Sequence, residues 1–200
     1  MGEGPLAAGK KNAARRGAAL IFIDEAGVLI TPLVRRTWAP RGQTPVLYQR
    51  GRSRQKVSVI AALVVPRRRN RVRCLFRLAP DASIDGRGVR AFVGHLLRVV
   101  RGPVVLIWDR SNTHRGEPVK SWLAARRRRV RVELLPPYAP ELNPVELVWG
   151  HTKRNPLANY APPDLAALVR ATRASTRRLA RKQSVLRALL RHGGLSVRLK

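Results

Sequence analysis

Acidic residues are scarce in this sequence, and two of them stand where they could bind a ligand. The 200 residues include 11 Asp and Glu against 41 Lys and Arg. Asp24 and Asp109 each follow an apolar run that is typical of a buried strand, and strand ends are where α/β folds expose chemically active groups. A charge at such a place is costly unless it binds something. Together the two aspartates indicate a binding site, although either one alone also fits a turn residue after a strand.

A third carboxylate comes from the proline-rich segment 135–149, which holds Glu141 and Glu146. Asn143 fits the N-cap of a following helix and Pro144 fits its first position, so Glu146 falls on the first turn. A glutamate there can close a capping box, complement the helix dipole or supply a metal ligand. The spacing alone does not choose between these roles, or between the two glutamates as the third acid.

Carboxylates brought together from separate elements have the chemistry of a divalent-metal site. Their hard oxygen ligands suit Mg²⁺ or Mn²⁺. Two such ions can cleave a phosphodiester, one by activating a water or hydroxyl and the other by stabilising the leaving oxygen. The net charge of +30 attracts polyanions and would dock the nucleic acid that the carboxylates repel. A coding bias towards arginine accounts for part of this charge, but not for where the basic residues cluster.

The spacing of apolar residues predicts the strands and helices that position these acids. We expect strands at residues 18–27, 57–65, 72–78, 103–109 and 130–135, with residues 28–38 pairing back against the first strand. We expect helices over residues 86–100 and 117–128, from residue 143 onward, and over residues 164–192. Strands followed by alternating strands and helices indicate an α/β or α+β domain with a mixed sheet.

Three motifs carry a resemblance to a known family. They are FIDEAG (22–27), IWDRSNTH (107–114) and LPPYAPELNPVELVWGHTK (135–153). Together they resemble the catalytic domain of the mariner-like DDE transposases of bacterial insertion sequences, and RTWAPRGQTP (36–45) resembles the family's stretch after the first strand. The resemblance implies an α/β fold of the RNase H-like type, a mixed β-sheet flanked by helices. The sequence adds a basic C-terminal helical extension.

The resemblance also implies the active-site residues. Asp24, Asp109 and Glu146 match the three catalytic, metal-binding acids, and Glu141 becomes a loop residue. They are expected to hold two divalent ions, Mg²⁺ or Mn²⁺. The implied reaction is cleavage of DNA strands at transposon ends, followed by transfer of the freed 3′-hydroxyl into target DNA. One departure is Arg110, which stands where many relatives carry Asn, and it leaves the fine positioning of the second acid open.

The chain divides into three expected segments. Residues 1–17 lack periodicity and are expected to be a disordered basic lead-in, residues 18–160 the RNase H-like DDE catalytic domain, and residues 161–200 a basic helical C-terminal segment. Full-length relatives carry an N-terminal helix-turn-helix region, which we do not find ahead of the first motif. We therefore expect either the second frame of a split gene, partnered by an upstream-frame helix-turn-helix segment, or a truncated remnant.

Basic and polar residues in or near the motifs are the candidate DNA contacts. They are Arg50, Arg52, Arg54, Lys56, Asn112, His114 and Lys153. The first four alternate along the chain, so an extended strand would present them on one face. His114 could contact DNA or order Asp109, and it equally fits a surface turn. Phosphate contacts of this kind give salt-sensitive binding that tolerates different base sequences.

The remaining expectations concern partners and location. Double-stranded DNA, as transposon ends and target, is the expected substrate, and the family implies a homodimer because transposition holds two ends together. The single cysteine suits a reducing compartment, and no apolar run is long enough to span a membrane, so we expect a cytoplasmic, nucleoid-associated protein. Two alternatives stay open. One is an inactive or truncated transposase remnant acting only as a basic nucleic-acid-binding protein, and the other is an RNase H-like structure-selective nuclease.

Overall fold

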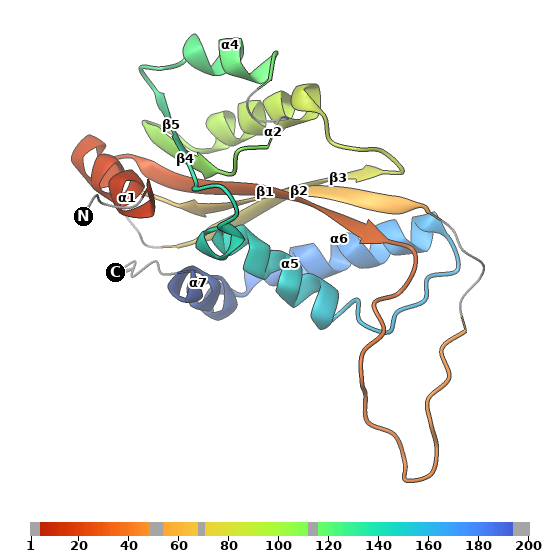
Figure 1. Ribbon diagram of the computed structural model, residues 1–200. Coiled ribbons are helices and arrows are strands. Elements are labelled where there is room, and N and C mark those ends of the chain that lie inside the picture. The colour runs from red at the N-terminus through yellow and green to blue at the C-terminus, as the bar shows by residue number, and fades with distance from the viewer. Residues whose placement is uncertain (1–4, 49–53, 68–70, 112–115, 194–200) are drawn as a thin grey trace.

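The fold is built on one five-stranded mixed sheet, shown in the computed structural model of Figure 1. The structure describes residues 5–48, 54–67, 71–111 and 116–193. The strands are β1 (Ala19–Leu29), β2 (Lys56–Val65), β3 (Arg73–Pro80), β4 (Val104–Trp108) and β5 (Val130–Leu134), in the order β3-β2-β1-β4-β5. The side chains of β4 are all buried, as are all but the first of β2, because helices cover the sheet on both faces.

Strand β1 belongs to both halves of the sheet. It pairs antiparallel with β2 from Leu20 to Leu29, but it pairs parallel with β4 only from Ala19 to Phe22. The prediction that this strand ends near residue 27, with residues 28–38 pairing back against it, is therefore wrong. β1 continues to residue 29 because β2 is long enough to pair with it over that whole length.

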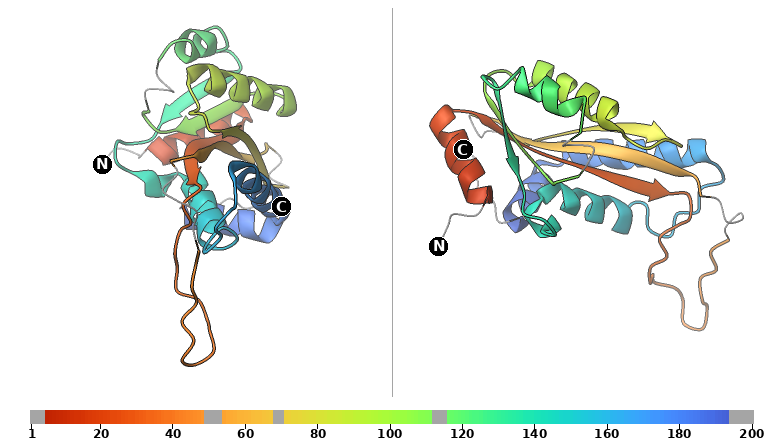
Figure 2. Two further views of the ribbon diagram at one scale, coloured as in Figure 1. Left: turned by 90° about the vertical axis from the view of Figure 1, so that its right-hand side faces the viewer. Right: turned by 45° about the horizontal axis from the view of Figure 1, so that its top comes forward.

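Helices lie on both faces of the sheet, as Figures 1 and 2 show. One face carries α2 (Gly86–Val99) and α4 (Val119–Ala124), and the other carries α5 (Pro144–Arg154), α6 (Leu165–Arg181) and α7 (Gln183–His192). Each face has its own apolar core, with Phe92 and Leu96 on the α2 side and Trp149 and Leu168 on the α5 side. In the described residues no helix is long and apolar enough to cross a membrane.

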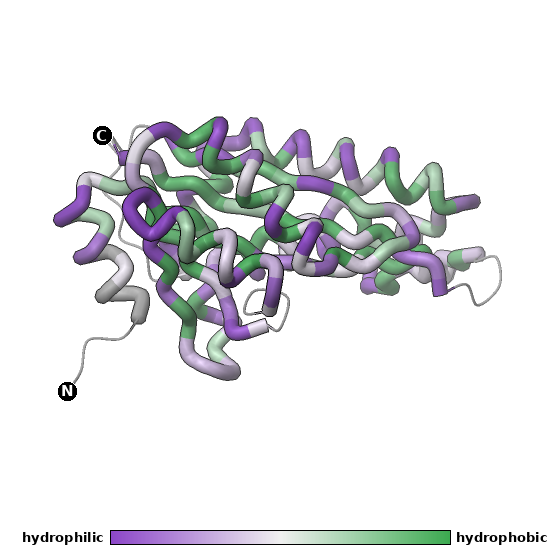
Figure 3. Tube along the Cα trace, turned by 90° about the horizontal axis from the view of Figure 1, so that it is seen from above, coloured by the Kyte–Doolittle hydropathy of each residue, from purple (hydrophilic) through white to green (hydrophobic). Residues whose placement is uncertain are grey.

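The C-terminal helices are layers of the fold rather than an extension. Asp164 caps α6, where its carboxylate accepts a hydrogen bond from the Ala167 N–H at 2.6 Å, and α6 packs on β2 and β3. Leu168 and Leu179 of α6 are buried in the core, while hydrophilic and hydrophobic stretches alternate along the helices when the molecule is seen from above (Figure 3). A division at residue 160 would separate α6 from the strands that it covers.

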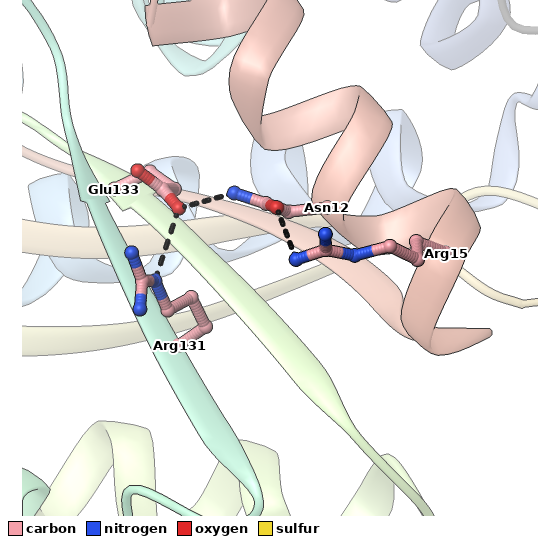
Figure 4. Close-up of polar contacts among 4 residues, drawn as sticks. All are labelled: Asn12, Arg15, Arg131 and Glu133. Carbon is pink, nitrogen blue, oxygen red and sulfur yellow. Dashed lines mark hydrogen bonds and ion pairs between the residues drawn. The ribbon is translucent and has the colours of Figure 1, made fainter.

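The N-terminal segment is also part of the fold. Residues 5–16 form a helix, α1 (Pro5–Arg16), where a disordered lead-in was expected. Ala13 is buried, and Asn12 Nδ2 donates to Glu133 Oε1 of β5 at 2.9 Å, beside the ion pair of Glu133 with Arg131 (Figure 4). The prediction failed because alanines, rather than large apolar side chains, make up most of the helix's apolar residues.

A long loop joins β1 to β2 and projects away from the sheet (Figures 1 and 2). Its described part carries exposed apolar side chains, with Trp38 99% and Tyr48 85% accessible to solvent. Near its start, the side chain of Asn159 accepts a hydrogen bond from the Arg35 N–H at 2.7 Å and donates one to the Arg35 carbonyl at 2.9 Å. The loop is therefore tied at its base to the segment that follows α5.

Candidate active site

Asp24 and Asp109 lie at the same end of two parallel strands because of the register of these strands. Phe22 of β1 pairs with Ile107 of β4, and each aspartate lies two residues farther along its strand direction. β4 ends at Trp108, so Asp109 follows a strand end as expected. Asp24, in contrast, lies within β1, opposite Ala61 of β2, and is therefore held on a paired strand rather than in a turn.

Helix α5 brings Glu146 to the same end of the parallel strands. The Asn143 side chain accepts a hydrogen bond from the Val145 N–H at 3.2 Å, which caps the helix, and its Nδ2 donates to the Ile23 carbonyl at 3.1 Å. Asn143 is buried, so one amide side chain both starts the helix and joins it to β1. The predicted helix start, with Asn143 as N-cap and Pro144 at the first position, is confirmed.

Of the other roles considered for Glu146, complementing the helix dipole fits its place on the first turn of α5, but closing a capping box does not. A capping box would use Glu146 to accept from the Asn143 N–H, but that N–H already donates to the Pro140 carbonyl at 2.9 Å. Glu146 is exposed. Glu141 lies in a short 3-10 helix, Pro140–Leu142, and is also exposed.

One pocket gathers all three predicted acids. It has a volume of about 430 Å³. Its walls are the aspartate pair with Arg110 and Ser111, the proline-rich loop 135–140, Asn143 and Glu146. Glu141 is not among the residues that line it. Arg110 contributes to the wall and donates from Nε to the Leu135 carbonyl at 3.2 Å, which links the end of β4 to the proline-rich loop.

The pocket places several carboxylates around Asp24. Burial, together with the nearby Glu146, Glu25 and Asp109 carboxylates, raises the pKa of this carboxyl from 3.8 to about 7, although a hydrogen bond from Trp149 acts in the opposite direction. Like charges this close favour either a proton or a cation between them. The pocket is therefore suited to binding a positive ion.

Trp149 is a polar contact that the sequence pattern did not reveal. It lies on α5, and its side chain is buried. Its indole Nε1 also donates to Asp24 Oδ2 at 2.8 Å in a buried hydrogen bond. The sequence could have indicated that a buried indole N–H needs an acceptor. Only the packing of α5 on β1 shows that Asp24 is this acceptor.

The predicted DNA contacts that the structure describes do not lie in one place. Lys56 lines a second pocket that includes Asp24 and Asp109, whereas Arg54 is exposed and lines neither pocket. Lys153 lies on the last turn of α5 and lines a separate, largely apolar pocket near Leu157 and Tyr160. The predictions for Arg50, Arg52, Asn112 and His114 fall outside the described residues.

Residues 19–169 match the protein family described as DDE superfamily endonuclease. The chain belongs to that family. The match covers all three predicted acids of this DDE endonuclease and most of the described fold. It also continues into α6, beyond the boundary expected at residue 160. No curated protein matches the sequence.

Solved structures of Mos1 transposase share the fold. A Mos1 transposase paired-end complex with the left transposon end has a TM-score of 0.67 at 14% identity, covering 93% of this chain and 55% of that chain. A Mos1 mariner paired-end complex with Mn gives 0.64 at 15% identity, covering 94% and 56%. The corresponding complex with Mg gives 0.61 at 16% identity, covering 94% and 57%. The sheet and its flanking helices are thus RNase H-like, and the DDE endonuclease chain spans little more than half the length of these Mos1 chains.

The residues of the pocket fit divalent metal ions by their chemistry. Among the described residues no three His, Cys, Asp or Glu side chains are placed as a group that could hold a single ion. The pocket wall instead offers carboxylate oxygens from β1, the end of β4 and the first turn of α5. Oxygen ligands of this kind are the ones that Mg²⁺ and Mn²⁺ prefer, and two ions would divide the acids between them.

Proposed function

We propose that this chain is the catalytic domain of a transposase of the mariner-like, bacterial insertion-sequence type. It would cleave DNA strands at transposon ends and transfer the freed 3′-hydroxyl into target DNA. The observation that supports this proposal is the gathering of Asp24, Asp109 and Glu146 around one open pocket in a chain of the DDE endonuclease family. The Mos1 complexes that share the fold hold transposon ends, and some of them Mn or Mg.

In this proposal Asp24, Asp109 and Glu146 are the catalytic residues and hold two Mg²⁺ or Mn²⁺ ions. Such ions supply an activated oxygen nucleophile and neutralise charge on the leaving oxygen. Trp149 leaves one Asp24 oxygen free for a ligand because it donates to Oδ2 alone. Asn143 holds the first turn of α5, and with it Glu146, against β1. The proline-rich loop walls one side of the pocket and limits how the substrate enters.

The test is cleavage of duplex DNA that carries the terminal repeats of the element, with Mg²⁺ or Mn²⁺ added. We expect strand cleavage by the wild-type chain and loss of it in Asp24→Asn, Asp109→Ala and Glu146→Gln. Glu141→Gln is the matched control, since it removes an acid from the same segment outside the pocket, and it should cleave normally. Cleavage that persists in Asp109→Ala would show the site assignment to be wrong.

The same assay separates the proposal from its alternatives. A transposase remnant would bind the DNA through its positive charge and leave it uncut. A structure-selective nuclease would cut branched or flapped duplexes and ignore the terminal repeats. If only an added helix-turn-helix segment restores recognition of the repeats, this chain is the catalytic part of a split transposase.

The basic residues are proposed to dock double-stranded DNA in this role. They are Arg50, Arg52, Arg54, Lys56, Asn112, His114 and Lys153. A net charge of +30 would make the binding strongly dependent on salt. A protein acting on transposon ends and target DNA in this way would work in the cytoplasm, associated with the nucleoid.

We also propose that the chain acts as a homodimer, which would hold two transposon ends together. The support lies in the loop between β1 and β2, which presents apolar side chains to solvent. The most exposed are Val34, Trp38, Val46 and Tyr48. Side chains of this kind gathered on one projecting segment are typical of an interface with another protein.

A further inference from the structure

Two pockets meet at the aspartate pair. The larger one, described above, carries Glu146 and the proline-rich loop. The second, of about 350 Å³, shares Asp24, Asp109 and Ser111 with the first but lies against β2 and the turn after β3. Its wall holds Lys56, Ser58 and Ser83, together with Glu25, in place of Glu146 and the prolines. The proposed function names Lys56 as one of several basic residues that dock DNA, but it gives this pocket no role of its own.

Lys56 is the positively charged side chain among the described residues that line this second pocket. Its ammonium group donates to the Ser83 hydroxyl at 3.1 Å. An ammonium has three donors, so Lys56 can bind a further acceptor beside this serine. In a wall that otherwise carries acids, one cation beside two hydroxyls is suited to an anion that arrives at the aspartates.

The backbone holds these three residues in place. Lys56 and Ser58 follow one another on the same face of β2, with Ser58 opposite Gly27 of β1. A Cβ built on Gly27 would come within 4.0 Å of Lys56 Cδ, so the lysine side chain passes beside this glycine. The Asp81 N–H donates to the Lys56 carbonyl at 2.9 Å, which ties the turn that carries Ser83 to the start of β2.

We propose that Lys56, Ser58 and Ser83 form a phosphate subsite for the DNA strand that is cut. It holds a backbone phosphate next to the one at Asp24 and Asp109, on the side away from Glu146. The strand then runs across the aspartates from one pocket to the other, with Lys56 on one side and Arg110 on the other. This subsite rests on the proposed DNA cleavage, and it adds which part of the strand each pocket holds.

The test pairs a lysine variant with DNA in which single phosphates are made neutral. Binding of the terminal-repeat duplex is measured without divalent ions, so that it stays uncut, with one methylphosphonate placed in turn at each position near the cleavage point. In the wild-type chain a neutral linkage at the phosphate held by Lys56 should weaken binding about tenfold. In Lys56→Met that penalty should vanish at this one position and persist elsewhere. The slope of log affinity against log salt should fall by about 0.9.

Arg77→Met is the matched control, because Arg77 is an exposed basic residue on β3 that lines neither pocket. It should keep the wild-type pattern at every position. Lys56→Gln repeats the measurement if Lys56→Met melts at a lower temperature than the wild type, and Ser83→Ala should reduce the penalty at the same phosphate.

Identical interference patterns in the wild type and both lysine variants would overturn the subsite. That result differs from a failure of the proposed function, in which the wild-type chain neither binds nor cuts the terminal-repeat DNA. A penalty that vanishes at a phosphate several nucleotides from the cleavage point would also count against it, since both pockets share the same aspartates.

Discussion

The buried carboxyl of Asp24 makes the stability of the protein depend on pH. Its folded-state pKa of about 7 lies above its ordinary value of 3.8, so the folded state favours the protonated acid. The stability it contributes is full below about pH 4 and is lost as the pH rises through 7. Asp24→Asn should therefore be more stable than the wild type at pH 8, by about 1 to 4 kcal/mol, with the difference shrinking towards pH 4. Urea unfolding at several pH values, without divalent ions, measures this.

With divalent ions present, the wild type should become more stable than Asp24→Asn at pH 8. Mg²⁺ that binds the folded wild type and not the unfolded chain raises its melting temperature at pH 8, while Asp24→Asn, with one ligand removed, should respond little. The comparison needs no cleavage activity and can be followed by thermal melting across a Mg²⁺ titration. Equal responses of the two proteins would count against Asp24 as a metal ligand.

The indole of Trp149 is expected to position Asp24 for the metal. Trp149→Phe keeps most of the ring in the core but removes the hydrogen bond of 2.8 Å to Oδ2. Loss of a partner that orients a ligand typically lowers metal affinity or activity by about 10- to 100-fold. Mn²⁺ binding by calorimetry and cleavage as a function of Mn²⁺ concentration should both shift by such a factor. Trp122→Phe, on the opposite face of the sheet, should leave both unchanged.

At the level of elements, the join between α5 and β1 places the third acid. Asn143→Ala removes the cap of α5 and leaves the buried Ile23 carbonyl without its donor, at a cost of about 2 to 3 kcal/mol. Asn143→Ser keeps a capping oxygen, so it should lose only the stability that comes from the hydrogen bond to the Ile23 carbonyl. Asp164→Ala, which removes the cap of α6 alone, should cost about 1 kcal/mol and leave cleavage intact. Urea unfolding and the cleavage assay distinguish the three.

The sequence predicts those elements whose signals are local. A few consecutive residues are enough to predict each of these elements. They are the apolar runs of β2 and β4, the apolar positions of α2, and the start of α5 at Asn143 and Pro144. Elements that depend on distant partners were missed or misread. β1 extends past residue 27 because β2 pairs with it, and α1 is ordered through a contact between Asn12 and Glu133.

The candidate site follows the same rule. The three acids could be predicted from their motifs and from the family resemblance, and the structure brings them to one pocket. The partners of those acids could not be assigned, because they come from other parts of the chain. Trp149, which donates to Asp24, lies 125 residues from it. Lys56 likewise has its partner elsewhere in the chain, since Ser83 lies in the turn after β3. No spacing in the sequence encodes such pairs.

For the whole molecule, the exposed loop should control assembly. Replacing Trp38 and Tyr48 with serine removes apolar surface that has little contact with the core, since the two side chains are 99% and 85% accessible. The melting temperature should stay unchanged while the homodimer weakens, which sedimentation velocity over a range of concentrations would detect. A monomeric wild type, or a double variant that dimerises equally well, would refute the proposed role of the loop.

The pairing of β1 with β2 has a consequence for how separable that loop is. The two strands remain in register up to Leu29 opposite Lys56, so the loop is closed by a ladder that does not depend on the chain continuing through its tip. A protease that nicks the chain between residues 36 and 48 should leave two fragments that stay associated as one folded unit. The segment proposed for assembly could then be cut, exchanged or lengthened while the carboxylate pocket keeps its shape.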